Sequence, residues 1–128
     1  MKRMNPWQRY QAFPCSYVAT GCAYEDMHHT SFFGVLPDGL RDDGYVPLKY
    51  INTFVRKYLP VKKKLYFNKK SRIKLSDFLK EHKESMIICL LGHCIYANGG
   101  DYMSFFDNED DTVVCVWYLN EPSHSPFA

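Results

Sequence analysis

The sequence predicts an α+β domain, in which N-terminal helices pack on a C-terminal antiparallel sheet. Three observations indicate this class. Helix-type patterns dominate the first half of the chain, strand-type patterns dominate the last third, and no repeat or linker divides the 128 residues. The composition is 46% hydrophobic and 16% aromatic, which is enough for one packed core. We therefore expect a single domain over residues 1–128, with its core at residues 8–119 and a loose tail at 120–128.

The first helix signals precede residue 35. Residues 15–24 follow Pro14, which suits the first turn of a helix, although Gly21 lowers the helix propensity of this segment. Residues 25–34 form a second helical stretch that ends at Gly34. Two turn signals come next, at residues 37–39 and 42–44.

Two further helices are expected in the middle of the chain. Residues 47–59 repeat apolar side chains at spacings of three and four, and Pro60 stops the helix. Residues 76–82 form a short helix, for which Ser76 is the expected N-cap.

Strand signals fill the last third of the chain and one earlier segment. The predicted strands are residues 61–68, 86–91, 92–97, 102–106 and 112–119. The run at 92–97 either extends the apolar strand before it or pairs with it. Asn98-Gly99 signals the hairpin turn that leads to the return strand. An acidic turn at 107–111 comes before the last strand.

The cysteine count indicates a reducing compartment. The chain has five cysteines, at positions 15, 22, 89, 94 and 115. An odd number cannot be fully paired, and the last three lie in apolar runs, where a free thiol behaves as a small hydrophobe. We therefore expect a cytoplasmic setting. No apolar run reaches the roughly 18 residues of a membrane span, and we expect neither a membrane contact nor a secretory signal.

The charge is strongly segregated along the chain. Residues 44–83 carry twelve basic and two acidic side chains, whereas residues 84–128 carry seven acidic side chains and neither Lys nor Arg. A basic block of this kind can bind phosphate groups or an acidic partner. No nucleic-acid-binding motif accompanies it. We therefore expect a solvated face that balances the acidic third of the chain, and no nucleic-acid partner.

Three residues have the order and type of a catalytic thiol system. Cys15 lies at a helix start, where the positive end of the helix dipole favours a thiolate. His93 lies on an apolar strand and fits the role of base, and Asp107 follows across one hairpin, where its carboxylate can fix the imidazole tautomer. Asn108 is the alternative for that orienting role.

An oxyanion site is also expected near Cys15. The backbone N–H groups at a helix start can stabilise the oxyanion of an acyl-transfer intermediate. A side-chain amide can add a second donor, and both Gln8 and Gln11 lie shortly before Cys15. Gln11 is closer to the loop that folds against Cys15, and Gln8 has the freer reach, so both stay open. We expect no cofactor and no metal, because neither a phosphate-binding glycine loop nor four convergent zinc ligands can be found.

Two segments carry a resemblance to a known family, residues 11–19 around the cysteine and residues 92–107 around the histidine hairpin. Together with the final aromatic strand, they resemble the small papain-like cysteine peptidases. The likeness is strongest to compact forms similar to the bacteriocin-processing (C39-like) peptidases and to short papain-like proteins of bacteriophages. It spans roughly residues 8–119.

The resemblance implies a papain-like fold and a cysteine hydrolase that cleaves a peptide or isopeptide bond. Carried over residue by residue, it gives Cys15 as nucleophile, His93 as base, Asp107 as orienting carboxylate, and Gln8 or Gln11 as oxyanion donor. The expected partner is a peptide or protein substrate in the cytoplasm, in a host cytoplasm or in a virion. The alternative is a non-catalytic papain-fold protein that binds or assembles with another protein, for example in a phage particle.

Overall fold

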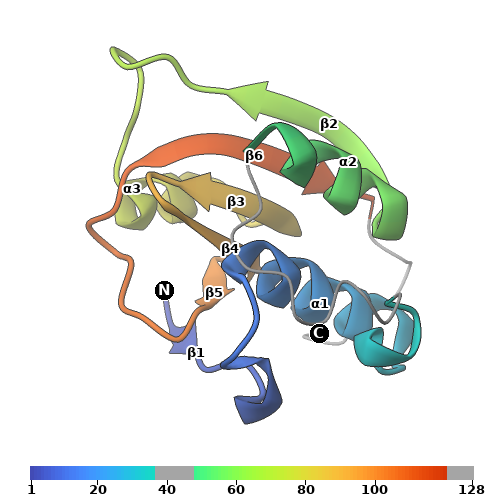
Figure 1. The fold of residues 1–128 in the computed structure, drawn as a ribbon. Coiled ribbons are helices and arrows are strands. Elements are labelled where there is room, and N and C mark those ends of the chain that lie inside the picture. Colours follow the sequence, from blue (N-terminus) through green and yellow to red (C-terminus); the bar gives the residue numbers. More distant parts are fainter. Residues whose placement is uncertain (37–47, 121–128) are drawn as a thin grey trace.

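The chain folds as a six-stranded sheet with helices on both faces, in a computed structural model that describes residues 1–36 and 48–120 (Figure 1). The helices are α1 (Cys15–His28), α2 (Leu48–Tyr58) and α3 (Leu75–Glu81), with short 3-10 turns η1 (Gln8–Tyr10) and η2 (Phe32–Gly34). The strands are β1 (Arg3–Met4), β2 (Val61–Tyr66), β3 (Met86–Leu90), β4 (His93–Asn98), β5 (Asp101–Met103) and β6 (Val113–Leu119). The expected α+β class is confirmed. The turn signals at 37–39 and 42–44 and the tail at 121–128 lie outside the described residues.

The sheet has the strand order β1-β5-β4-β3-β6-β2. All neighbouring pairs are antiparallel except β1 and β5, which run parallel at one edge. Side chains alternate between the two faces, so the sheet separates two cores. One core contains Ile87, Tyr96 and Trp117 and is covered by α1 and α2, and the other contains Ile88 and is covered by α3. Figure 1 shows α1 and α2 on the same face.

The first helix is longer than predicted. It begins at Cys15 as expected but continues to His28, and His29 ends it in the left-handed region with φ 56°. The second helical stretch predicted at 25–34 is therefore wrong: its first part belongs to α1, and only the single turn η2 follows. The helix ends at His29 because this residue forms a C-cap, in which its N–H donates to the Glu25 carbonyl.

Gly21 lies in the middle of α1 because of a close approach. A Cβ atom at this position would lie 2.5 Å from the Tyr10 hydroxyl and 2.8 Å from Phe32. The Tyr10 hydroxyl also hydrogen-bonds to Glu25 on the next turns of α1. Glycine therefore lets the segment before Cys15 pack directly on the helix, in spite of its low helix propensity.

The third helix starts one residue earlier than predicted. Its N-cap is Lys74 and not Ser76, which lies inside the first turn. Lys74 has extended backbone geometry and forms an isolated bridge with Thr112. The Ser76 N–H donates to the Glu109 carbonyl. Pairing with the 109–112 segment sets this helix start, and no side-chain cap is present.

The hairpin between β3 and β4 positions the segment that carries His93. Leu90 pairs with His93, so the turn is the two residues Leu91 and Gly92, and Gly92 has φ 86°. The run at 92–97 therefore pairs with the preceding strand instead of extending it. A left-handed φ at the turn favours glycine, and the tight turn places His93 at the first position of β4.

The next hairpin differs from the prediction by one residue. Asn98 pairs with Asp101, so the turn is Gly99-Gly100, with φ 66° and 88°, and not Asn98-Gly99. The return strand ends at Met103 instead of residue 106, and the N–H of the next residue, Ser104, donates to the Met4 carbonyl of the neighbouring strand β1. Strand β1 was not predicted from the sequence, because two residues are too few to show the side-chain alternation of a strand.

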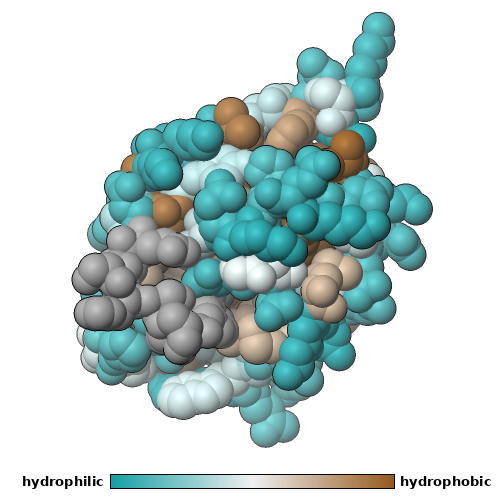
Figure 2. All heavy atoms as spheres, turned by 180° about the vertical axis from the view of Figure 1, so that it is seen from behind, coloured by the Kyte–Doolittle hydropathy of each residue, from teal (hydrophilic) through white to brown (hydrophobic). Residues whose placement is uncertain are grey.

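The basic block lies at the opposite sheet edge from β1. Lys62, Lys63 and Lys64 belong to the edge strand β2 and are exposed. The Lys63 ammonium lies 4.7 Å from the centroid of Tyr118 and the Lys64 ammonium 5.2 Å from that of Trp117. Hydrophilic side chains also cover much of the face in Figure 2. No helix within residues 1–36 and 48–120 has the length and apolarity of a membrane span.

Candidate active site

A cleft of about 760 Å³ lies at the N-terminal end of α1, where the loop before this helix meets the start of β4 and the segment after β5. It is lined by Asn5, Pro6, Gln8, Gln11, Phe13, Cys15, Val18, His93, Cys94, Met103, Ser104, Phe105 and Phe106. Four of the five site residues expected from the sequence are therefore brought together. Asp107 is not among the lining residues.

Cys15 is a half-buried thiol at the first position of α1. Its pKa is lowered from the ordinary 9.0 to about 4. The largest cause is a hydrogen bond from the Cys94 side chain, followed by a hydrogen bond from the His93 imidazole and the positive charge of that ring, with a further contribution from the Cys94 backbone. Partial burial opposes these effects. Cys15 is thus a thiolate at neutral pH, which is the nucleophilic form of cysteine.

The backbone N–H groups of Cys15 and Ser16 lie at the start of α1, before the first N–H groups that donate to a carbonyl of this turn. The N–H groups of Tyr17 and Val18 both donate to the Pro14 carbonyl. Among the residues that the structure describes, no carbonyl accepts from the N–H of Cys15 or Ser16. Free N–H groups at a helix start bind anions, because they add to the positive end of the helix dipole.

His93 is oriented by a serine. The His93 Nε2 atom lies 3.1 Å from the Ser104 hydroxyl oxygen, and the ring packs edge-on against Phe106 with a centroid distance of 5.7 Å. Ser104 is buried and lies within 2.5 Å of the Asn108 Oδ1 atom. The Asn108 amide nitrogen in turn lies 2.6 Å from the Asp111 carboxylate.

The donor and the acceptor of each of these hydrogen bonds follow from the carboxylate of Asp111, which ends the chain. An ionised carboxylate only accepts, so the Asn108 amide must turn its NH₂ group to Asp111 and its oxygen to Ser104. The Ser104 hydroxyl then donates to Asn108, which leaves its oxygen to accept from His93 Nε2–H. The neutral imidazole is therefore protonated on Nε2, and Nδ1 is the nitrogen that remains for the Cys15 sulfur. This tautomer leaves Nδ1 as the nitrogen that gains and loses the proton beside Cys15.

Asp107 does not contact His93. It is exposed, and its Oδ1 atom accepts from the Glu109 N–H at 3.1 Å and lies 3.5 Å from the Tyr102 hydroxyl. The carboxylate thus stabilises the acidic turn, as Asp commonly does in turns. Ser104 contacts His93 in the orienting role that was expected of Asp107. Asn108, the alternative for that role, contacts Ser104 and not His93 itself.

Gln8 and Gln11 both line the cleft from the loop before α1. Gln8 is the first residue of the turn η1 and Gln11 is its C-cap, whose N–H donates to the Gln8 carbonyl. Both side chains are exposed. Either amide can reach the cleft, so the choice between them stays open.

Two residues of the cleft were missed by the sequence analysis. Ser104 lies three positions before Asp107 and directly after β5, whose last pair is Met103 with Tyr96. Extending this register by one residue would set Ser104 opposite Ile95, which shares the face of His93. Counting strand positions from the Gly99-Gly100 turn would have identified Ser104 as a candidate partner of His93. Cys94 was regarded as a packing residue because it follows His93 on an apolar strand. Its contact with Cys15 depends on how α1 lies on β4, for which the sequence has no signal.

The described residues contain no group of three or more His, Cys, Asp or Glu side chains arranged to hold a metal ion. No family model, characterised protein or solved structure matches the chain.

Proposed function

We propose that this chain is a small papain-like cysteine hydrolase that cleaves a peptide or isopeptide bond, with Cys15 as nucleophile and His93 as its acid–base partner. The observation that supports this function best is the joint position of the two side chains in one cleft, at a helix start, with the pKa of Cys15 lowered to about 4. The pKa values of Cys22, Cys94 and Cys115 are raised. A hydrogen bond from Cys94 lowers the pKa of Cys89, but Cys89 is buried and does not line the cleft.

In the first half of the reaction, the Cys15 thiolate attacks the carbonyl carbon of the scissile bond. The carbonyl oxygen becomes an oxyanion, which the N–H groups of Cys15 and Ser16 and the amide of Gln8 or Gln11 can stabilise. The His93 imidazolium then gives a proton to the leaving amine, and the C–N bond breaks. The product of this half is a thioester between Cys15 and the acyl part of the substrate.

In the second half, a water molecule attacks the thioester. His93, now neutral, takes a proton from this water through Nδ1, while Nε2–H remains bound to Ser104. The tetrahedral intermediate releases the Cys15 thiolate and a carboxylic acid. The chain Ser104–Asn108–Asp111 ends in a negative charge and therefore stabilises the imidazolium, both the one present at the start of the first half and the one that forms in the second half.

Labelling and hydrolysis together test this function. We would treat the parent protein, Cys15→Ala and the matched control Cys22→Ala with a low concentration of iodoacetamide at neutral pH and locate the label by peptide mapping. The same proteins would then be incubated with a quenched fluorescent peptide library. The proposal expects label on Cys15 and turnover in the parent and the control, and neither in Cys15→Ala. Faster labelling of Cys89 or Cys115 than of Cys15 would contradict it.

A non-catalytic binding protein with the same fold is the second candidate. The exposed lysines make the β2 edge of the sheet basic, and the turn at 107–111 is acidic and meets the basic segment at the Lys74–Asp110 ion pair. Complementary faces of this kind steer protein association. Capture of the same partner protein by the parent and by Cys15→Ala, with no turnover in the parent, would favour this candidate.

A further inference from the structure

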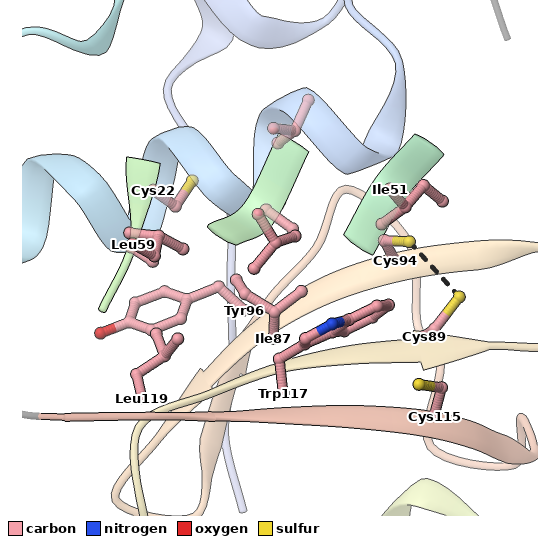
Figure 3. Packing of buried hydrophobic residues seen from close by; sticks show 14 of the residues in the cluster. Cys22, Ile51, Leu59, Ile87, Cys89, Cys94, Tyr96, Cys115, Trp117 and Leu119 are labelled. Carbon is pink, nitrogen blue, oxygen red and sulfur yellow. Dashed lines mark hydrogen bonds between the residues drawn. The ribbon is translucent and has the colours of Figure 1, made fainter. Parts of the chain in front are cut away.

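Three of the five cysteines form a row across one face of the sheet, and a fourth, Cys15 of α1, lies at its end. Cys94 on β4 is directly opposite Cys89 on β3, and Cys89 is directly opposite Cys115 on β6. The Cys94 and Cys89 sulfur atoms are 3.6 Å apart. Figure 3 shows this pair joined by a hydrogen bond, with Cys115 on the neighbouring strand and Cys22 apart from them. Cys15 packs against the same core, at the cleft end of the row.

Only Cys15 and Cys94, the first two thiols of this row, line the cleft. Cys15 is half-buried and lines the cleft, and Cys94 also lines the cleft although only 5% of its surface is exposed. Cys89 and Cys115 are buried and do not line it. A small oxidant that enters the cleft therefore meets Cys15 first, and Cys94 is the next thiol that it or an oxidised Cys15 can meet.

We propose that Cys94 is the resolving thiol for Cys15, so that oxidation of Cys15 by a peroxide leads to a reversible disulfide between these two residues. In the first step the Cys15 thiolate attacks one peroxide oxygen. The O–O bond breaks, an S–O bond forms, and hydroxide or alkoxide leaves. Cys15 is then a sulfenic acid.

In the second step the Cys94 sulfur attacks the Cys15 sulfur. The S–O bond breaks, the S–S bond forms, and the oxygen leaves as water with the proton of the Cys94 thiol. Overall two thiols have lost two electrons to one peroxide. A thiol reductant returns both residues to the starting state by disulfide exchange.

Cys89 can then take over the disulfide. Directly opposed residues of an antiparallel pair have Cα atoms about 4.5–5.5 Å apart, which lies inside the range of about 4.4–6.8 Å that disulfides span. Attack of Cys89 on Cys94 would release the Cys15 thiolate and place the disulfide between β3 and β4. The row could in this way move an oxidised state from the cleft into the core.

The ionisation of Cys15 agrees with its place as the first thiol to be oxidised. The lowered pKa of Cys15 makes it the thiolate that peroxides oxidise. Hydrogen bonds to Cys15 and Cys89 raise the pKa of Cys94, which therefore attacks as a protonated thiol. A hydrogen bond from Cys94 lowers the pKa of Cys89, but this thiol is buried and does not line the cleft. Burial raises the pKa of Cys22 to about 12 and that of Cys115 to about 11, so these two thiols are inert. Cys15 and Cys94 line the same cleft, and the Cys94 side chain is a hydrogen-bond partner of Cys15 before any oxidation.

The experiment is intact-mass analysis and non-reducing peptide mapping after treatment with excess hydrogen peroxide. We would compare the parent with Cys94→Ser, Cys94→Ala, Cys15→Ser and the matched control Cys22→Ser, and check each fold by circular dichroism. The parent and the control should lose two hydrogen atoms, with a disulfide that contains Cys94, and dithiothreitol should reverse the change. Both Cys94 variants should instead gain two or three oxygen atoms on Cys15 irreversibly, because no thiol resolves the sulfenic acid.

A disulfide between Cys15 and Cys94, or its exchange product between Cys89 and Cys94, supports the proposal if it requires Cys15. Formation of the second disulfide at an undiminished rate in Cys15→Ser would overturn it. So would sulfinic acid on Cys15 as the main product in the folded parent. The masses do not depend on hydrolysis of any substrate, so the proposal stands or fails separately from the proposed function.

Discussion

The ionisation of Cys15 makes a quantitative prediction about its reaction with a small disulfide reagent such as dithiodipyridine. With a pKa of about 4, Cys15 is fully ionised from pH 6 to pH 9. In the urea-unfolded chain, a thiol with a pKa near 9 is ionised in about one molecule in a thousand near pH 6. The depressed pKa therefore gives Cys15 of the folded protein about a thousandfold more thiolate near this pH.

Lower basicity reduces part of this advantage. Thiolate nucleophilicity falls with a Brønsted coefficient of about 0.4–0.5, so a decrease of about five pKa units slows the attack roughly 100–300-fold. Folded Cys15 should therefore react about 3–10 times faster than the unfolded thiol near pH 6. Near pH 9, where about half of the unfolded thiol is ionised, folded Cys15 should react roughly a hundredfold more slowly.

The assay is stopped-flow release of thiopyridone, with the site of reaction confirmed by peptide mapping. The rate of folded Cys15 should be flat above pH 5 and fall as the pH decreases through about 4, since the thiolate is lost there. His93→Ala removes one of the contacts that lower this pKa, so the inflection should move to higher pH, while Cys22→Ser should leave it in place. A rate that keeps rising about tenfold for each pH unit between 6 and 9 would refute the assignment of Cys15 as a thiolate.

Three further predictions follow from the cleft and from α1. Ser104→Ala should lower kcat at least about tenfold, because it removes the partner that fixes the imidazole tautomer, whereas Asp107→Asn should leave kcat unchanged; equal losses in a peptide-hydrolysis assay would contradict the orienting role of Ser104. If a side-chain amide stabilises the oxyanion, either Gln8→Ala or Gln11→Ala, but not both, should lower kcat about a hundredfold at unchanged thiol reactivity. Gly21→Ala should destabilise the protein by roughly 1–3 kcal/mol in urea unfolding, because the new methyl group overpacks the helix interface, and a stabilisation of about 1 kcal/mol from helix propensity alone would contradict this close contact.

The sequence contained enough information to place Cys15 and His93, because each has a local signal. Pro14 marks the start of α1 and thus puts the cysteine at the dipole end. The apolar run that ends at Leu90 and the glycine at position 92 mark a tight hairpin, which puts His93 at the start of the next strand. Local chemistry decides both features, so no knowledge of the tertiary structure was needed.

The partner of His93 could not be found in the same way. A serine, an aspartate and an asparagine follow the return strand within five residues, and a one-residue error in the turn changes which of them faces the histidine. The end of β5 at Met103 depends on β1, whose two residues are too short for any pattern. The start of α3 similarly depends on the contact of Lys74 with Thr112, which is distant in sequence.

The pairing of β1 with β5 means that the N-terminal residues act as a brace for the histidine. The Met4 carbonyl accepts from the Ser104 N–H at 3.1 Å, and the Arg3 guanidinium donates to the Ser104 carbonyl at 3.0 Å. Both backbone groups of the residue that holds His93 are therefore held by β1. Limited proteolysis before Asn5, or a bulky fusion at the N-terminus that disturbs this pairing, should impair the cleft although Cys15 and His93 themselves are intact.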